Sequence, residues 1–208
     1  YEIFRNSTEN VTNEIAVGLG SKIPLGSYND SVGNIEPFTG QMYYVTMPQN
    51  VQLSSGAQDL IFFAMYYRTY RKSNFSVFAN SMYIYKSWNP NGERLGDFFS
   101  VSLYGEKTFF EKLGTTLQLR YEQVDAMLIN ENTLMYGKPS TYYPEATGYK
   151  KVFLTPQVRY TLGNFSVFAA MDLPLYQYLN TSEYYTQVGT EHSTTVGVSW
   201  HFPVYKPK

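Results

Sequence analysis

The feature that most restricts the fold of this chain is the strict alternation of side chains over residues 194–202. One face of an extended chain there carries only apolar side chains, namely Val196, Val198, Trp200 and Phe202. The opposite face carries only small or polar ones, namely Thr195, Gly197, Ser199 and His201. A period of two predicts a β-strand, because successive side chains of a strand point to opposite faces. The two aromatic residues at its end are typical of a lipid-facing strand that reaches the headgroup level.

Similar alternation, or a high content of Phe, Tyr and Ile, marks further strands along the chain. We expect about eight strands, at residues 14–23, 59–70, 75–86, 98–106, 116–124, 152–162, 165–173 and 194–202. Residues 1–4 would be the tail of a preceding strand, and residues 42–47 a short strand inside the first long connection. No segment shows a helical period, so the chain is predicted to be all-β.

The connections between these strands alternate in length. Short turns are predicted at residues 71–74, 111–114 and 162–164, and long loops at residues 26–57, 87–96, 128–149 and 177–191. Outer-membrane barrels have short turns on the periplasmic side and long loops outside. We therefore predict an antiparallel up-and-down transmembrane β-barrel, with about eight strands in this chain.

Composition excludes several classes of function. The net charge is −1, which does not suggest a nucleic-acid partner. There is no run of about 18 apolar residues, hence no transmembrane helix. The chain has no cysteine, which excludes disulfides, thiolate metal sites and cysteine nucleophiles. The 21 Tyr and 14 Phe, with a mean hydropathy of −0.32, are unusual for an ordinary core but natural for a barrel with aromatic girdles and a wet interior.

A soluble lipocalin-like barrel or β-sandwich is the alternative fold. Its apolar face points inward and its charged face meets water, whereas a membrane barrel is inverted. Alternation alone does not separate the two, because the pattern is the same from either side. Aromatic residues at strand ends, the asymmetry of the loops and the terminal pair Trp200 and Phe202 favour the membrane.

Three stretches resemble one family of outer-membrane transporters, the family named after the meta-pathway of phenol degradation. Residues 17–26 (VGLGSKIPLG) resemble its GLGxKLPTG strand end. Residues 55–60 (SGAQDL), 66–68 (YYR) and 75–79 (FSVFA) resemble its hairpin GTGxxDLxxGxxYxR…WSLFA. The family's closing pattern LSPGLRYRL…QLPLY…VGVSYRF is similar to segments 152–162 (VFLTPQVRYTL), 173–176 (LPLY) and 196–200 (VGVSW).

The resemblance implies a barrel that carries small hydrophobic or aromatic compounds across the membrane. Barrels of this family have further strands before the Gly-Leu-Gly segment, so it also implies a barrel of about twelve strands. In that case residues 1–202 are a barrel domain that lacks upstream strands, and residues 203–208 are a C-terminal periplasmic tail. The sequence differs from the family pattern in residues 155–157 (TPQ), where the family has Ser-Pro-Gly.

The polar faces of the predicted strands carry six charged residues that would line the interior: Lys22, Glu106, Arg120, Glu122, Arg159 and Asp172. They could form an eyelet that selects solutes, or a charge-paired network that braces the interior. Tyrosines in the last long loop could stack on an aromatic solute, contact a partner protein, or belong to the outer aromatic girdle. These are Tyr176, Tyr178, Tyr184 and Tyr185.

No pattern of residues predicts an enzyme. Ser199 and His201 share a face, but no third group that would orient the histidine is visible. Acidic and amide residues in the long loops lack the spacing of a known Ca²⁺ loop. We therefore expect no catalytic or metal residue and no cofactor.

The sequence thus predicts a porin-like transport barrel in the outer membrane of a Gram-negative bacterium. Its partners would be membrane lipid, a small apolar solute and, through the loops or the tail, a protein, but no nucleic acid. The alternative function is a plugged structural barrel whose loops or tail bind another protein of an outer-membrane assembly.

Overall fold

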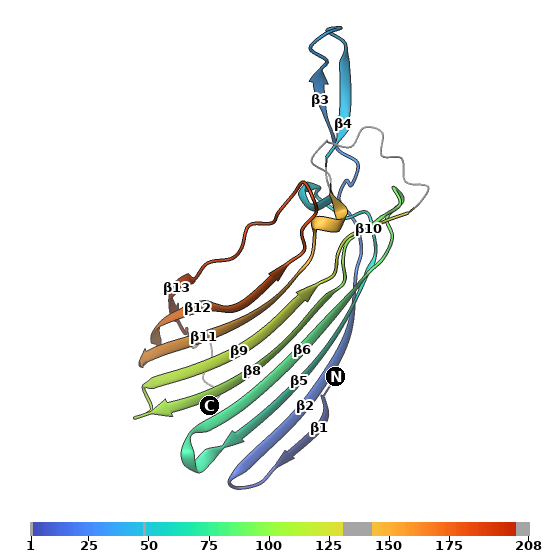
Figure 1. The fold of residues 1–208 in the computed structure, drawn as a ribbon. Helices are drawn as coiled ribbons and strands as arrows, with labels where there is room; N and C mark the ends of the chain where they lie inside the picture. The colour runs from blue at the N-terminus through green and yellow to red at the C-terminus, as the bar shows by residue number, and fades with distance from the viewer. Residues whose placement is uncertain (1, 48, 131–142, 203–208) are drawn as a thin grey trace.

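Nine long strands form one antiparallel sheet in the computed structural model, which describes residues 2–47, 49–130 and 143–202 (Figure 1). The strands follow each other across the sheet in chain order, as in a meander. They are β1 (Glu2–Ser7), β2 (Val11–Lys22), β5 (Asp59–Tyr70), β6 (Phe75–Lys86), β8 (Phe98–Phe109), β9 (Leu113–Val124), β11 (Tyr149–Leu162), β12 (Phe165–Leu179) and β13 (Ser193–Trp200).

Pairing between neighbours is continuous over most of the sheet. β5 and β6 pair from Asp59 opposite Lys86 to Tyr70 opposite Phe75, without interruption. The register shifts at two places, between Glu2 and Phe4 in β1 and between Val152 and Phe153 in β11. An extra residue at such a bulge bends the strand and increases its twist locally. The sheet curves strongly along its width (Figure 1).

Tight connections lie at one end of the sheet, which we call the turn end. They comprise residues 8–10, 71–74, 110–112 and 163–164. Left-handed residues make three of these turns possible: Asn74, the pair Phe110 and Glu111, and Gly163. The connection between Phe109 and Leu113 has three residues, and a positive φ at both Phe110 and Glu111 is typical of the two central residues of a type I′ turn.

Long connections lie at the opposite end, the loop end, as their spacing in the sequence predicted. One of them forms a hairpin, β3 (Ser31–Ile35) and β4 (Met42–Thr46), that stands away from the sheet (Figure 1). The same connection contains the 3₁₀ turn η1 (Gln49–Val51). Two other long connections contribute a two-stranded pair, β7 (Glu93–Arg94) with β10 (Leu128–Ile129), and one of them contains the 3₁₀ turn η3 (Pro144–Ala146). A further 3₁₀ turn, η2 (Arg71–Ser73), lies at the turn end.

The predicted all-β, antiparallel, up-and-down fold is confirmed, but the sheet is not closed into a barrel. β1 and β13 are its two edges. The sheet has nine strands rather than about eight, because residues 2–7 pair along β2 as a full strand. Several strands are longer than predicted: β11 begins at Tyr149 and β12 ends at Leu179. The predicted tail, residues 203–208, lies outside the described residues.

The burial of side chains in the sheet is the reverse of that in an ordinary soluble domain. Only five apolar side chains are buried among the described residues, and four of them, Ala57, Met127, Pro144 and Ala146, lie in loop-end connections. In the strands, buried positions are mostly polar, for example Thr12, Ser102 and Thr155. No helix in the described part of the chain is long and apolar enough to cross a membrane.

Candidate functional site

The two faces of the sheet differ sharply in chemistry and exposure. On the convex face, Leu103 and Leu117 are 53% and 52% exposed. Ser102, the neighbour of Leu103 on the concave face, is only 2% exposed. The register places every second residue of each strand on the same face. Over β8 and β9 the convex face is therefore mainly apolar and exposed, and the concave face carries polar side chains. On β5 and β6 the concave face also carries exposed apolar side chains, such as Phe63 and Met82.

Aromatic side chains gather near both ends of the strands on the convex face. Near the loop end these are Phe62, Tyr83, Tyr85, Phe99, Tyr121, Tyr176 and Tyr178. Near the turn end they are Tyr70, Phe75, Phe109, Tyr160, Phe165 and Trp200. Several pair across strands, such as Phe62 with Tyr83, whose ring centroids are 6.3 Å apart. Aliphatic and small side chains fill the zone between these two aromatic bands.

All six charged residues predicted to face the interior lie on the concave face, and each has a charged partner. Arg120 of β9 carries the largest cluster: its Nη2 is 3.3 Å from Asp172 of β12. Its Nε is 3.1 Å from Glu122 Oε1, a close ionic contact without the alignment of a hydrogen bond. Thr155 donates a hydrogen bond to Asp172, and the Arg120 guanidinium lies 4.7 Å from the centre of the Phe153 ring. This cluster therefore ties β9, β11 and β12 together.

A second ion pair joins Glu106 of β8 to Arg159 of β11, with 3.2 Å between Oε1 and Nη2. Both side chains are well exposed, so solvent screens their attraction strongly. β9 lies between these two strands, so the pair reaches across the curvature of the sheet.

A third ionic cluster lies at the loop end of β2, β5 and β6. The Asp59 carboxylate is 1% exposed and accepts a hydrogen bond of 2.8 Å from Lys86 Nζ. The predicted residue Lys22 lies 3.7 Å from the same oxygen, Oδ2. The other oxygen, Oδ1, has no hydrogen-bond partner in the described part of the chain. Asp59 and Lys86 were not singled out from the sequence, although both end predicted strands and share a register position.

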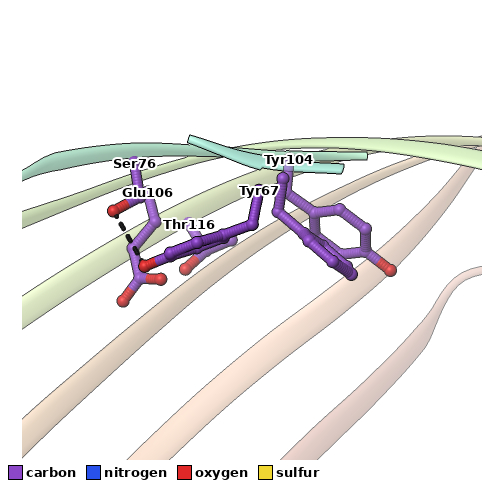
Figure 2. A pocket seen from close by; sticks show the side chains of 6 residues that line it. Tyr67, Ser76, Tyr104, Glu106 and Thr116 are labelled. Atoms are coloured by element: carbon purple, nitrogen blue, oxygen red, sulfur yellow. Dashed lines mark hydrogen bonds between the residues drawn. The ribbon is translucent and has the colours of Figure 1, made fainter. Parts of the chain in front are cut away.

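Two adjoining hollows occupy the concave face between these charges. The first, of about 280 Å³, is lined by Tyr67, Ser76, Phe78, Tyr104, Glu106 and Thr116 (Figure 2). The Tyr67 hydroxyl lies 3.2 Å from Ser76 Oγ, and the rings of Phe78 and Tyr104 are 5.1 Å apart. The second hollow, of about 300 Å³, shares Tyr104 and reaches Arg120 and Glu122. Gln118 donates a hydrogen bond of 2.9 Å to the Tyr104 hydroxyl between them.

The concave face is divided between an apolar and a charged half. β5 contributes Ile61, Phe63 and Met65, and β6 contributes Phe78 and Met82, to one half. β9, β11 and β12 contribute the Arg120 cluster to the other. The Phe63 ring covers Gly18 of β2 so closely that a Cβ there would lie 2.1 Å from it. A side chain at position 18 would therefore force the Phe63 ring to move from its place on Gly18.

The four tyrosines predicted as loop contacts fall into two groups. Tyr176 and Tyr178 lie within β12, in the loop-end aromatic band of the convex face, so their placement in a loop was wrong. Tyr184 and Tyr185 do lie in the connection between β12 and β13. Tyr143, from another connection, stacks on both, with centroids 6.3 Å and 6.0 Å away.

At the loop end, Asp97 holds the start of β8 to the end of β6. It accepts hydrogen bonds from the Tyr83 hydroxyl (2.7 Å), from the Lys86 backbone N–H (2.8 Å) and from Arg94. Burial raises the pKa of Asp97, but these hydrogen bonds outweigh it and hold the pKa below its ordinary value. This carboxylate is a structural clamp.

Ser199 and His201 do not form a catalytic arrangement among the described residues. Ser199 lies opposite Ser166 in the β12–β13 ladder, while His201 follows the end of β13 and is exposed. No group of three or more potential metal ligands forms in the described ranges either.

Comparisons with models of known protein families, with curated proteins and with solved structures found no match.

Proposed function

We propose that this chain forms the wall of a β-barrel in the bacterial outer membrane, with its convex face toward lipid. The observation that carries the proposal is the inverted burial of the sheet: exposed Leu103 and Leu117 on one face, buried Ser102 and Thr155 on the other. In water, this arrangement leaves a large apolar surface without cover. Against hydrocarbon the same surface is stable, and the polar groups lie inside.

Strand length and the aromatic bands support the same proposal. A tilted strand needs about 9 to 11 residues to cross a bilayer. Five strands of the sheet have 12 residues and β11 and β12 have 14 and 15. The convex aromatic bands lie near both strand ends, where interfacial girdles belong.

We propose further that the concave face lines a passage for small hydrophobic or aromatic compounds. The first hollow has room for a small ring compound, since engineered cavities of about 150 Å³ bind benzene. Its lining combines the rings of Tyr67, Phe78 and Tyr104 with hydroxyl groups that could orient a polar substituent. The resemblance to the phenol-pathway transporters, which rests on sequence motifs, agrees with this class of solute.

Binding of a solute tests this passage. The urea-unfolded chain is refolded in detergent and titrated with a small aromatic solute such as phenol, and calorimetry measures the binding. We expect refolding that depends on detergent and binding that Tyr104→Ala weakens. Tyr70→Ala on the convex face is the matched control and should leave the binding unchanged. Refolding in plain buffer, or the same affinity for the original chain and for Tyr104→Ala, contradicts the proposal.

A second candidate function is docking of another protein at the loop end. The observation that favours it is the β3–β4 hairpin, which stands away from the sheet (Figure 1). It exposes a set of large apolar side chains: Val32, Ile35, Phe38, Met42, Tyr43 and Tyr44. Deleting residues 31–46 should leave binding of the aromatic solute unchanged if the hairpin only binds a partner. A loss of solute binding would instead assign the hairpin to the passage.

A further inference from the structure

We infer that the edge of β13, which is unpaired among the described residues, pairs with an antiparallel amphipathic strand, and that an odd number of such strands joins β13 to β1. The inference rests on the proposed membrane barrel, and it names the kind of partner that closes it. Direction of the strands, not the position of the chain ends, carries the argument.

β1 and β13 run in the same direction. β1 leads into the tight connection at residues 8–10, so it runs from the loop end to the turn end. β12 leaves the turn at residues 163–164 toward the loop end, and β13 returns antiparallel to it, again toward the turn end. Direct contact between the two edges would therefore be a parallel pair. Single-chain bacterial barrels are antiparallel throughout, with an even number of strands, so nine strands cannot close in that way.

A second copy of this chain does not solve the problem. Two copies related by an axis along the barrel would place β13 of one beside β1 of the other, which is again a parallel pair. A two-fold axis perpendicular to the barrel axis would pair β1 with β1 and β13 with β13 of the second copy, both antiparallel. One of the two copies would then have its loop end on the opposite side of the membrane. One or any other odd number of further strands restores antiparallel pairing at both edges.

The edge of β13 lacks the features that keep an edge from pairing. Proteins protect edge strands with Lys, Pro, bulges or very short strands. β13 has eight residues, none charged and none proline, and it follows β12 in unbroken register. Its convex side chains Val196 and Val198 are 70% and 62% exposed. On the concave side, the Phe168 ring of β12 covers Gly197. The strand therefore presents a regular row of backbone groups to a partner.

A strand peptide with a single cysteine tests both the site and the direction. The full chain has no native cysteine, so Ser199→Cys provides one thiol near the turn end of β13. The probe is a synthetic peptide of residues 165–179, which is the strand that already pairs with β13 on its other side. One version carries Ser166→Cys near its N-terminus, and the other Gln177→Cys near its C-terminus. A third carries Ser166→Cys together with Val167→Pro and Ala169→Pro, which remove backbone donors.

We expect the Ser166→Cys peptide to form a disulfide with the refolded chain at least about tenfold faster than the other two, because antiparallel pairing at β13 brings position 166 next to Ser199. Equal reaction of all three peptides, or faster reaction of the Gln177→Cys version, overturns the inference.

Double variants of the chain alone provide the second measurement. Ser166→Cys with Ser199→Cys, which are direct partners, should cross-link under mild oxidation. Ser7→Cys combined with Thr195→Cys or with Ser199→Cys should not. A disulfide from β1 to β13 within one chain would show closure by nine strands, and one between two chains would show closure by a second copy. Either result refutes the inference. None of these readouts depends on a solute, so a loss of solute binding with intact peptide capture would refute only the proposed passage.

Discussion

The sheet and the connections at its loop end differ in how they arrange exposed and buried side chains. In the connections, apolar Ala57 and polar Gln49 are both buried, and a large apolar side chain such as Phe38 is fully exposed. In the central strands of the sheet, exposed apolar side chains such as Leu103 and Leu117 share the convex face, and buried side chains are mostly polar. Only the sheet therefore sorts these side chains by face. An ordered apolar face of this kind suits contact with lipid.

The largest expected effect is the difference in destabilisation between a charge placed on the convex face and one placed on the concave face of β9. Leu117→Arg places a charge on the convex face of β9, where it should cost about 2–4 kcal/mol of folding free energy in a bilayer if it lies near the midplane. Thr116→Arg, on the concave face of the same strand, is the matched control and should cost far less. Equilibrium unfolding from lipid vesicles measures both. Equal costs for the two variants would remove the distinction between the faces.

A second prediction concerns close packing on the concave face. Gly18→Val should destabilise the fold by about 1–3 kcal/mol, because a Cβ at Gly18 would lie 2.1 Å from the Phe63 ring. Gly20→Val is the control two residues further along β2, where the nearest atom, Ile61 Cβ, would be 3.6 Å away. Urea titration of the refolded variants checks the difference. If Gly20→Val were the more harmful change, the close packing of Phe63 on Gly18 would be wrong.

The third prediction compares a buried and an exposed ion pair on the same face. Asp59→Asn should destabilise by about 1–3 kcal/mol, because Asp59 is 1% exposed and accepts a charged hydrogen bond from Lys86. Glu106→Gln should cost less than about 1 kcal/mol, since Glu106 and Arg159 are both well exposed. The same unfolding assay is run at low and at high salt. The destabilisation caused by Glu106→Gln should depend on salt more strongly than that caused by Asp59→Asn. Equal losses of unfolding free energy in the two variants would mean that burial does not determine how much each ion pair stabilises the fold.

The smallest effect is expected at the loop end, from acid. Because the folded-state pKa of Asp97 is lowered, the folded chain binds fewer protons than the unfolded chain as pH falls past about 4. The stability that Asp97 contributes is therefore present above the ordinary carboxyl pKa and is lost as pH falls through the lowered value. Asp97→Asn should be less stable than the original chain at pH 7, and the gap should narrow toward pH 3. If the difference in stability between the original chain and Asp97→Asn stayed the same from pH 7 to pH 3, the charged hydrogen bonds of Asp97 would not hold β8 to β6.

Strand positions followed from the sequence where alternation or aromatic content was strong. β5 and β6 were predicted at both ends, because turn residues bound them on each side. β12 was predicted to end at residue 173, where the alternating pattern of residues 165–173 ends, although in the structure it continues to Leu179. In the structure Pro174 lies at the bulge opposite Phe153, where a missing N–H is tolerated. The strand continues, and this is why Tyr176 and Tyr178 belong to the convex band.

The shared face of the charged residues was also predictable, but their pairing was not. Period two alone places Glu106, Arg120 and Arg159 on one side of the sheet. The contacts from Arg120 to Asp172 and from Arg159 to Glu106 each pass over an intervening strand, so they depend on the curvature of the sheet. Curvature comes from twist and bulges that no single residue reveals. β3 was missed for a simpler reason: Gly33 and Asn34 are poor strand formers.

The most direct test of the central claim is a cysteine scan along β9 in lipid vesicles. Residues 116–121 are changed one at a time to cysteine, spin-labelled, and tested for collisions with lipid-soluble oxygen and with a water-soluble nickel complex. Labels at positions 117, 119 and 121 should collide mainly with oxygen, and those at 116, 118 and 120 mainly with nickel. The opposite phase, or equal access of the nickel complex to every position, would show that the convex face does not meet lipid.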